Sequence, residues 1–324
     1  MQIDIAIESW HYAKPFRIAY HTFDKSRLLV VTITDGDIVG RGEAGDHPKL
    51  QSLEAGRDSI LAISDALTAH MDQKTLMEAL PRGPARNAVD CALWDLACKR
   101  ARKRIWELAE LPAPRRIQTA LTIGIAPVEE MAEEARRRKD FRILKPKVDG
   151  HRWRETLEAI TEARPDAELI IDANEGWSMA QLREFLAECE RYRVRLLEQP
   201  LPVGDDEQLR GFRSPVPLVA DESFQGLPDI DRLRGLYQVV NIKLDKVGGL
   251  TEGLLAARRA REAGLEVMVG CNGATSLGIA PAYCIGLLGQ HADLDSPLIL
   301  AEDREPRLQY DGSELRPPDA ALWG

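Results

Sequence analysis

The stretch ELIIDANEGWSMAQLREFLAECERYRVRLLE, residues 168–198, contains one complete strand–helix–strand unit. Two short apolar runs, 168–172 and 194–198, flank an amphipathic helical pattern over 179–191. Strands that are buried on both faces of a parallel sheet are nearly continuous in apolar residues, as these two runs are. Each run ends in a carboxylate, Asp172 or Glu198, so the unit predicts both a fold and a position for chemistry.

The same unit repeats along most of the chain. The remaining apolar runs are 117–123, 142–147, 217–221, 239–243, 266–270 and 293–300, and further helical patterns cover 128–138, 153–163 and 251–263. Eight runs joined by short crossovers predict a parallel β/α barrel. An open doubly wound sheet is the competing topology, although the chain contains no G-x-G-x-x-G nucleotide-binding loop.

The first hundred residues have a different pattern, with strands first and helices after them. Runs at 3–9, 28–33 and 39–44, with a turn at Asp35-Gly36-Asp37, predict a small antiparallel meander. Helical periodicity follows over about 50–80. A second helix over about 85–102 begins after Pro84, a residue that suits the first turn of a helix.

Composition and charge exclude several classes of function. The chain of 324 residues has 43 Lys and Arg, 52 Asp and Glu, and a net charge of −9, which gives no reason to expect nucleic acid as a partner. No uncharged apolar stretch is long enough for a membrane span, and the acidic N-terminus does not resemble a signal peptide. Five cysteines without a C-x-x-C pair, and histidines without paired spacing, argue against structural zinc. We therefore expect a reduced, cytoplasmic protein, with Cys91 and Cys98 buried on one helix face.

Ionisable residues end nearly every apolar run of the repeat. In sequence order they are Lys145 and Lys147, Asp172, Glu198, Asp221 and Lys243, with neighbouring runs about one strand–helix unit apart. Reactive groups in β/α barrels project from the C-terminal ends of the strands. The spacing therefore predicts that these side chains meet at one mouth of the barrel.

Three of these residues predict a metal site. The carboxylates of Asp172, Glu198 and Asp221 would repel one another in one cleft, so they need a positive partner. One Mg²⁺ ion, which prefers oxygen ligands and keeps positions for water or substrate, satisfies all three. The alternative is a set of strand-end ion pairs with the neighbouring lysines.

The lysines predict acid–base chemistry. Lys145 and Lys147 lie at i and i+2 of a strand and face the same side, whereas Lys243 lies four strands further round the barrel. Crowding of ammonium groups near a cation lowers a lysine pKa, so that a neutral lysine can act as a base. A substrate carbon next to a carboxylate would then meet one amine on each face, and removal of its proton gives an enediolate. This geometry suits a racemase or epimerase, and a dehydratase can also use it.

The motifs that carry these residues resemble the muconate-lactonizing subgroup of the enolase superfamily. They are Lys145-Pro146-Lys147, Ile171-Asp172-Ala173-Asn174, Leu197-Glu198-Gln199-Pro200, Ala220-Asp221-Glu222-Ser223 and Asn241-Ile242-Lys243-Leu244-Asp245-Lys246-Val247-Gly248-Gly249. The resemblance implies a (β/α)₇β TIM-like barrel over 116–304. It also implies an α+β capping domain over 1–115, with residues 305–324 packing back on it. It assigns Mg²⁺ to the three carboxylates, acid–base roles to Lys147 and Lys243, and an electrostatic role to Lys145; Lys246 is taken as structural.

The reaction is suggested by Asp293-Leu294-Asp295 in the eighth run. Two acids at i and i+2 of a strand share one side, and with the metal already liganded they are free to meet a substrate cation. They resemble the Asp-x-Asp element that dipeptide epimerases use for the substrate N-terminus. We therefore predict a dipeptide epimerase that inverts Cα of the C-terminal residue by two-base 1,1-proton transfer through a metal-stabilised enediolate. The alternatives in the same superfamily are an o-succinylbenzoate synthase and an N-acylamino-acid racemase. A Schiff-base aldolase using Lys243 and a non-catalytic ligand-binding barrel are alternatives of other classes.

Several further residues are expected around the substrate. Thr122, near the end of the first barrel run, matches a family position that contacts the substrate backbone, and Cys271 and Asn272 follow the seventh run. Two capping-domain loops, 16–25 and 42–49, are expected to set side-chain specificity. They offer the cations Arg17, His21, Lys25, His47 and Lys49, and Arg27 follows the first of them. The sequence leaves open which of these point inward, which dipeptide is preferred, and whether the chain forms a homo-oligomer.

Overall fold

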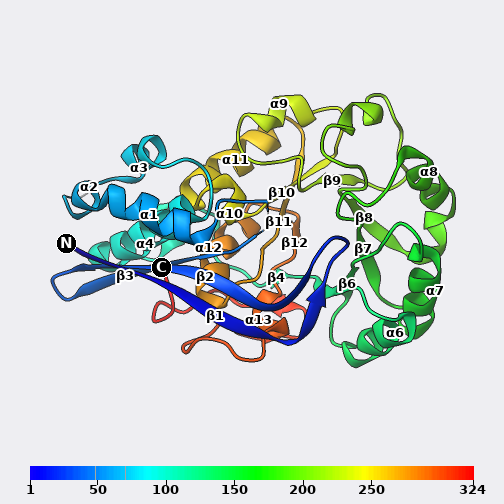
Figure 1. The fold of residues 1–324 in the computed structure, drawn as a ribbon, viewed down its shortest axis with the longest axis horizontal. Coiled ribbons are helices and arrows are strands. Elements are labelled where there is room, and N and C mark those ends of the chain that lie inside the picture. The colour runs from blue at the N-terminus through cyan, green and yellow to red at the C-terminus, as the bar shows by residue number, and fades with distance from the viewer. Residues whose placement is uncertain (48, 70) are drawn as a thin grey trace.

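The computed structural model describes residues 1–47, 49–69 and 71–324. The predicted loop 42–49 and the predicted helical segment 50–80 include Pro48 and His70, which lie outside the described residues. The chain forms a three-stranded antiparallel sheet, an eight-stranded parallel sheet and a small three-stranded sheet. Figure 1 shows the antiparallel sheet and its helices on one side of the curled parallel sheet.

The N-terminal region combines a long meander with five helices. Its elements are β1 (Gln2–Arg17), β2 (Thr22–Asp35), β3 (Ile38–Gly45), α1 (Leu53–Ala62), α2 (Ser64–Thr68), α3 (Gln73–Ala79), α4 (Pro84–Ala101) and α5 (Ile105–Leu108). The predicted strands at 3–9 and 28–33 are too short, because β1 and β2 continue as a hairpin that reaches the mouth of the barrel (Figure 1). Most of the predicted loop 16–25 is therefore strand.

Close packing joins β3 to α4. A Cβ atom on Gly42 would lie 2.0 Å from the Ala88 carbonyl oxygen, and one on Gly40 would lie 2.3 Å from that of Ala92. The two glycines therefore let the strand backbone rest directly on the helix backbone. Cys91 and Cys98 are buried on α4, as predicted, and the five cysteines, all among the described residues, are free thiols.

The barrel strands follow the predicted runs, with two exceptions. They are β5 (Leu121–Ile123), β6 (Ile143–Pro146), β7 (Glu168–Asp172), β8 (Val194–Glu198), β9 (Leu218–Ala220), β10 (Val239–Ile242), β11 (Glu266–Val269) and β12 (His291–Ala292), adjacent in that order. A hydrogen bond from the Ala120 amide to the Ala292 carbonyl, 2.9 Å long, brings the first and last strands together. The predicted β/α barrel is confirmed.

The first exception is the run 117–123, which is two strands. Its first part, β4 (Ile117–Gln118), leaves the barrel and pairs with β14 (Glu314–Leu315), which in turn pairs with β13 (Tyr310–Asp311). The second exception is the run 293–300, which is not a strand. The eighth strand ends at Ala292, and α13 (Ser296–Ile299) begins after Asp295, where Pro297 suits the first turn of a helix.

Helices and turns fill the crossovers. They are α6 (Val128–Arg137), α7 (Trp153–Ala163), α8 (Met179–Glu188), α9 (Asp229–Leu233), α10 (Leu244–Val247), α11 (Leu250–Glu262) and α12 (Ser276–Gly286), with 3₁₀ turns at Cys189–Tyr192 and Asp206–Leu209. Helix α12 was not predicted, because it is apolar around its whole circumference and lacks the amphipathic period that marks a surface helix. The turn Asp206–Leu209 lies in the crossover between β8 and β9.

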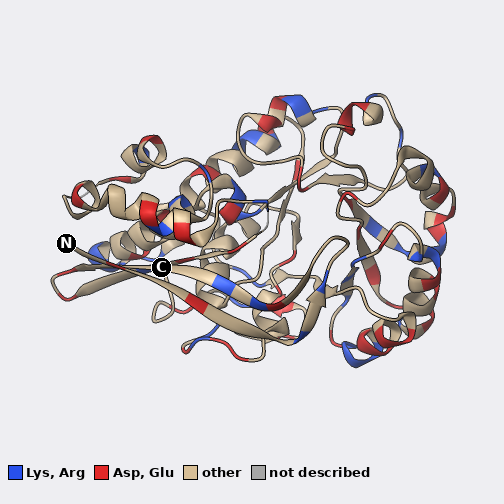
Figure 2. Ribbon diagram, viewed as in Figure 1, with Lys and Arg blue, Asp and Glu red and all other residues tan. Residues whose placement is uncertain are grey.

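The inside of the barrel is solid below the strand ends. One buried layer fills it, made of Ala120, Ile143, Ile170, Leu196, Val219, Val239 and Met268. Such a layer is a packed core rather than a pore, so the barrel is not an open channel. Acidic and basic residues are interspersed along the outer helices α6, α7 and α8 (Figure 2). Within the part of the chain that the structure describes, no helix is both long and apolar enough to cross a membrane.

Candidate active site

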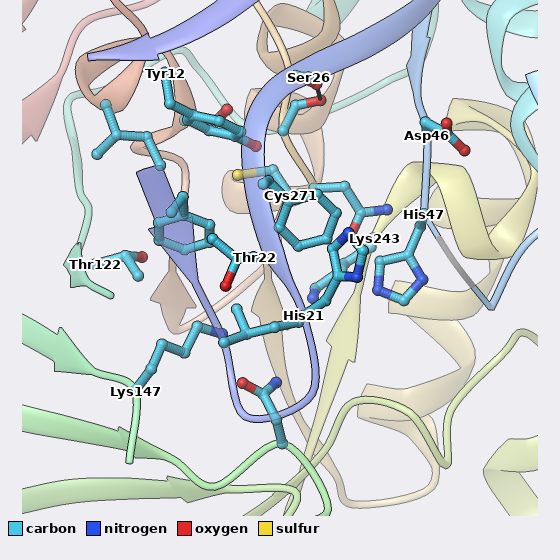
Figure 3. Close-up of a pocket in the computed structure, with 18 of the residues that line it drawn as sticks. Tyr12, His21, Thr22, Ser26, Asp46, His47, Thr122, Lys147, Lys243 and Cys271 are labelled. Atoms are coloured by element: carbon cyan, nitrogen blue, oxygen red, sulfur yellow. Dashed lines mark hydrogen bonds between the residues drawn. The ribbon is translucent and has the colours of Figure 1, made fainter. Parts of the chain in front are cut away.

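A cavity of about 510 Å³ lies at the C-terminal ends of the barrel strands, beneath the β1–β2 hairpin. The barrel contributes Thr122, Lys145, Lys147, Asp221, Lys243, Cys271, Asn272, Asp293 and Asp295 to its wall. The hairpin contributes apolar and polar side chains, including Tyr12 and His21, from the opposite side (Figure 3). The structure therefore brings the predicted strand-end residues to one mouth.

The three predicted metal ligands are completely or almost completely buried. Asp172 and Glu198 end β7 and β8, and Asp221 follows β9; their exposed fractions are 0%, 0% and 2%. Lys145 Nζ lies between two of them, 3.2 Å from Asp172 Oδ2 and 2.8 Å from Glu198 Oε2. Among the described residues, no group of three or more His, Cys, Asp or Glu side chains is arranged to hold a metal ion, and the Lys145 ammonium contacts two of the three predicted ligands.

The charges on these carboxylates differ. Burial raises the pKa of Asp172, but Lys147 and Lys145 outweigh burial and bring the pKa below its ordinary value. Asp221 is likewise held well below its ordinary pKa despite burial, chiefly by Lys243 and Lys246. Burial and the neighbouring Asp172 raise the pKa of Glu198 to about 7. Three mutually repelling buried carboxylates fit a hard divalent cation, which removes that repulsion.

Two further oxygen atoms near these acids also fit a cation. Asn174 Oδ1 and Glu222 Oε2 are buried and, within the described part of the chain, receive no hydrogen bond. Asn174 and Gln199 follow β7 and β8 with φ of 43° and 34°, a left-handed conformation that non-glycine residues adopt mainly at functional sites. The oxygen-rich donor set matches Mg²⁺ rather than a thiol- or imidazole-preferring metal.

A buried polar network holds the carboxylates in place. The Gln199 side chain accepts from the Asp221 and Ser223 amides at 3.0 and 3.1 Å and donates to Tyr237 Oη. Asn241 donates to Glu198 Oε1 at 2.9 Å, and Lys246 donates to Asp221 Oδ1 at 2.6 Å. Sequence reasoning missed Gln199 and Asn241, although both lie inside the motifs that it singled out.

The lysines lie on opposite sides of the cavity. Lys147 donates to Asp172 at 2.5 Å, and Lys243 donates to Asp221 at 2.9 Å. They follow β6 and β10, which are separated by three strands and so lie half the barrel apart. Figure 3 shows their side chains entering the cavity from different walls.

The surrounding carboxylates act against the lowered lysine pKa that was predicted beside a bound cation. Burial lowers the pKa of Lys145, but Asp293, Glu198 and the other carboxylates outweigh burial and raise it well above its ordinary value. Burial also lowers the pKa of Lys243, and Asp221 again outweighs burial and raises it. The carboxylates therefore set the pKa of both lysines, and a lowered pKa beside a bound cation stays a prediction.

The acid pair after β12 also faces the cavity wall. Asp293 and Asp295 are 4% and 2% exposed, so they are not solvated loop residues. Thr122 joins them: its amide donates to Asp295 Oδ2 at 2.6 Å, and its hydroxyl donates to Asp293 Oδ1 at 3.3 Å. Lys145 Nζ donates to the other oxygen of Asp293, Oδ2, at 2.6 Å. Burial and the charge of Asp293 raise the pKa of Asp295 to about 7.

The basic residues predicted in the capping-domain loops occupy three different positions. His21, Lys25, Arg27 and His47 line the active-site cavity, whereas Arg17 lines a neighbouring groove. Lys49 is an ion-pair partner of Glu175 on the barrel. Burial and Lys243 lower the pKa of His47 to about 4, so its imidazole is neutral at pH 7.

The capping domain also holds the loop after β11. Ser26 donates to the Gly273 carbonyl at 2.8 Å, and a Cβ atom on Gly273 would lie 2.2 Å from Tyr12 Oη. Asn272 donates to Asp245 at 3.1 Å, and Asp245 in turn accepts from the Gly45 amide of the capping sheet. Neither Tyr12 nor Ser26 was predicted, because their importance depends on contacts between distant segments.

Comparison with known families identifies the class of this protein. The model of the mandelate racemase/muconate lactonizing enzyme N-terminal domain matches residues 1–109, and the enolase C-terminal domain-like model matches residues 128–321. Together they cover most of the chain. The chain therefore belongs to the mandelate racemase/muconate lactonizing enzyme family of the enolase superfamily, as its motifs predicted.

Individual relatives narrow this class to isomerases. The L-Ala-D/L-Glu epimerase of Escherichia coli is 39% identical, over 95% of this chain and 97% of its own length. The N-acetyl-D-glutamate racemase of Pseudoalteromonas sp is 36% identical, over 92% and 95%. Like these relatives, the chain is an isomerase of the racemase and epimerase type that acts on amino-acid derivatives.

Two solved structures share the whole fold. One is an enolase family member from Agrobacterium tumefaciens with homology to dipeptide epimerases, bound to sodium and L-Ala-L-Glu; its TM-score is 0.96 at 39% identity, covering 99% of both chains. The other is a dipeptide epimerase from Methylococcus capsulatus in complex with Mg and L-Arg-D-Lys. Its TM-score is 0.90 at 29% identity, covering 98% of this chain and 97% of that chain.

Proposed function

We propose that this protein is a Mg²⁺-dependent dipeptide epimerase that inverts Cα of the C-terminal residue, with L-Ala-L-Glu as the first substrate to test. The observation that carries the proposal is the position of Lys147 and Lys243 on opposite walls of one cavity, with the buried acid pair Asp293 and Asp295 beside it. The similarity to the Escherichia coli epimerase and to the structure bound to L-Ala-L-Glu supports it.

In this proposal the two lysines exchange the Cα proton. One of them, Lys147 or Lys243, removes the proton from one face, and the other returns a proton to the opposite face, which inverts the centre. Lys145 lies among three carboxylates, so its ammonium is placed to stabilise negative charge on the substrate carboxylate.

Asp172, Glu198 and Asp221 would hold one Mg²⁺ ion. The bound ion would neutralise these carboxylates and would stabilise the negative charge of the developing enediolate. Since the Asp221 carboxylate raises the pKa of Lys243, its neutralisation would lower that pKa. Gln199, Asn241 and Lys246 keep the three carboxylates oriented through their hydrogen bonds. A capping domain over 1–115 and a barrel over 116–304 remain our proposed division of the chain.

Asp293 and Asp295 would bind the α-ammonium of the dipeptide. Lys145 forms an ion pair with Asp293 and is shared with Asp172 and Glu198, so a substrate ammonium would supply further positive charge to the acid pair. The N-acetyl-D-glutamate racemase relative supports a second candidate function, racemisation of N-acylated amino acids. Such a substrate has no ammonium group and leaves the acid pair without its partner.

Deuterium exchange distinguishes the candidates. The enzyme is incubated with Mg²⁺ in D₂O with L-Ala-L-Glu or with N-acetyl-L-glutamate. Deuterium at Cα of both compounds and the diastereomer ratio of the dipeptide are followed by NMR, and racemisation of the N-acyl compound is followed by polarimetry. We expect exchange and epimerisation of the dipeptide to be faster than those of the N-acyl compound. Faster turnover of N-acetylglutamate would favour the N-acylamino-acid racemase instead. If neither compound exchanges, and no member of a wider dipeptide library does, epimerisation and racemisation of these substrates are refuted.

A further inference from the structure

A second cavity of about 980 Å³ lies beside the active site, and we call it the side groove. Its walls are the outer part of β1, the end of β5 with the following turn, helix α6 and the end of α13. The residues that line both cavities are Tyr12, Phe16, Thr22, Thr122 and Ile299. The side groove and the active site are therefore neighbours that share one wall.

Thr122 connects this shared wall to the acid pair. Its amide and hydroxyl hold Asp295 and Asp293, so an ammonium group bound by these acids lies next to Thr122. In a dipeptide, the Cα of the N-terminal residue is bonded directly to the nitrogen of this ammonium group. The direction into the barrel is filled by Lys145, which is 1% exposed and contacts Asp293. Thr122 also lines the side groove, so a side chain at that Cα that turns away from Lys145 would be directed toward this groove.

The inner surface of the side groove is apolar. Pro15, Phe16, Ile125 and Leu298 line it, and a hydrogen bond of 2.8 Å from the Ile125 amide to the Arg17 carbonyl holds β1 against the end of β5. A Cβ atom on Gly124 would lie 3.2 Å from the Phe16 ring, so the glycine lets the two walls approach closely. Such a surface favours an apolar side chain.

Several of the charged residues that line the groove pair with one another. Glu134 on α6 accepts from Lys14 across the groove at 3.3 Å and from Arg138 at 2.8 Å. Burial raises the pKa of Glu134, but its arginine partners outweigh burial and lower it to about 2. Arg17, Glu129 and Glu130 also line the groove, but their side chains are exposed and remain solvated by water. The charged residues of the groove therefore do not require a charged substrate side chain.

We propose that the side groove binds the side chain of the N-terminal residue of the dipeptide and selects large apolar residues there, such as Leu or Phe. This inference rests on the proposed function, because it requires the ammonium at Asp293 and Asp295. It extends that function, since the preferred substrate then has an N-terminal residue much larger than the alanine of L-Ala-L-Glu.

The test compares kcat/KM for L-Ala-L-Glu, L-Leu-L-Glu and L-Phe-L-Glu, measured by deuterium exchange at Cα of glutamate. We expect at least one bulky dipeptide to exceed L-Ala-L-Glu by about tenfold, the effect that filling an apolar pocket typically has on kcat/KM. A tenfold preference for L-Ala-L-Glu over both bulky dipeptides would refute the proposed role of the side groove while leaving the proposed epimerisation intact. Failure with all three would instead count against the proposed function.

Substitutions in the groove then locate the preference. Ala126 lines the side groove and not the active-site cavity, so Ala126→Trp should lower the ratio of L-Leu-L-Glu to L-Ala-L-Glu turnover by about tenfold or more. Ala126→Ser is the matched control and should keep the ratio. Leu298→Trp, on the opposite wall, repeats the test if circular dichroism shows that Ala126→Trp is misfolded. An unchanged ratio in a folded Trp variant would refute the proposal.

Discussion

Replacing Asp295 with asparagine separates recognition of the substrate ammonium from the chemistry. The buried carboxylate accepts from the Thr122 amide at 2.6 Å, and asparagine can keep that bond through its own oxygen while losing the charge. A hydrogen bond to a charged group contributes about 1.5–3 kcal/mol. At about 1.4 kcal/mol per factor of ten, kcat/KM for L-Ala-L-Glu should fall by about 10- to 150-fold.

The assay is the ratio of kcat/KM for L-Ala-L-Glu and N-acetyl-L-glutamate in the wild type and in Asp295→Asn. The N-acyl compound lacks the ammonium, so its kcat/KM should stay constant or rise, and the ratio should collapse. Asp24→Asn, at a cavity-lining acid of the hairpin, is the matched control and should leave the ratio nearly unchanged. Equal losses for both compounds in Asp295→Asn would show that the residue acts on the fold or on the lysines, and would refute our reasoning.

The same variant should change the pH dependence of stability. Burial and Asp293 raise the pKa of Asp295 from 3.8 to about 7, so the folded protein holds this proton more tightly than the unfolded chain. The free energy of unfolding therefore falls as pH rises from about 4 to about 7, and Asp295→Asn removes that loss. In urea unfolding, the free energy of unfolding of the variant should rise relative to that of the wild type between pH 5 and pH 8. If the difference between the two free energies stays constant over this range, the raised pKa of Asp295 is contradicted.

Three further outcomes follow from the site and its supports. Lys147→Ala and Lys243→Ala should each lower epimerisation by at least about 10²-fold with an unchanged circular dichroism spectrum; a variant that still epimerises at the wild-type rate would disprove the two-base assignment. Dialysis against EDTA should abolish activity and Mg²⁺ should restore it, with a gain of about 2.7 kcal/mol in unfolding free energy at 100 times the dissociation constant; activity that survives chelation would argue against the metal. Glu43→Ala should lower the unfolding free energy by about 1–3 kcal/mol in urea, because the buried Glu43 carboxylate accepts from Thr275 and Arg304, and Glu43→Gln should lose less.

Local pattern predicted most of the barrel and the residues at its mouth. Buried parallel strands are nearly continuous in apolar residues, so β7 and β8 were predicted with the bounds that the structure has. Each strand end then marked a position for chemistry, which is why Asp172 and Glu198 were found without any knowledge of their contacts. Periodicity and position along the chain were sufficient for these features.

Features that depend on closure of the fold were not predictable in this way. Asp293 and Asp295 were placed on a strand, but they follow β12, and it is their bonds to Thr122 that bring them together. The pKa values of the lysines depend on carboxylates from distant strands, as the contact between Lys145 and Asp293 shows. The outer half of the hairpin faces the cavity rather than a core, and it lies outside the apolar runs 3–9 and 28–33 from which the strands were predicted.

The hairpin of β1 and β2 has a consequence for how this scaffold can change. Its inner half is part of the antiparallel sheet. In its outer half β1 and β2 pair only with each other, above the ends of the barrel strands, and the register shifts between His11 and Phe16. Residues on the outer half can therefore be exchanged without disturbing the carboxylates or lysines below. Grafting residues 16–25 from one relative to another should transfer side-chain preference while proton transfer continues, so new substrates can be explored at small risk to folding.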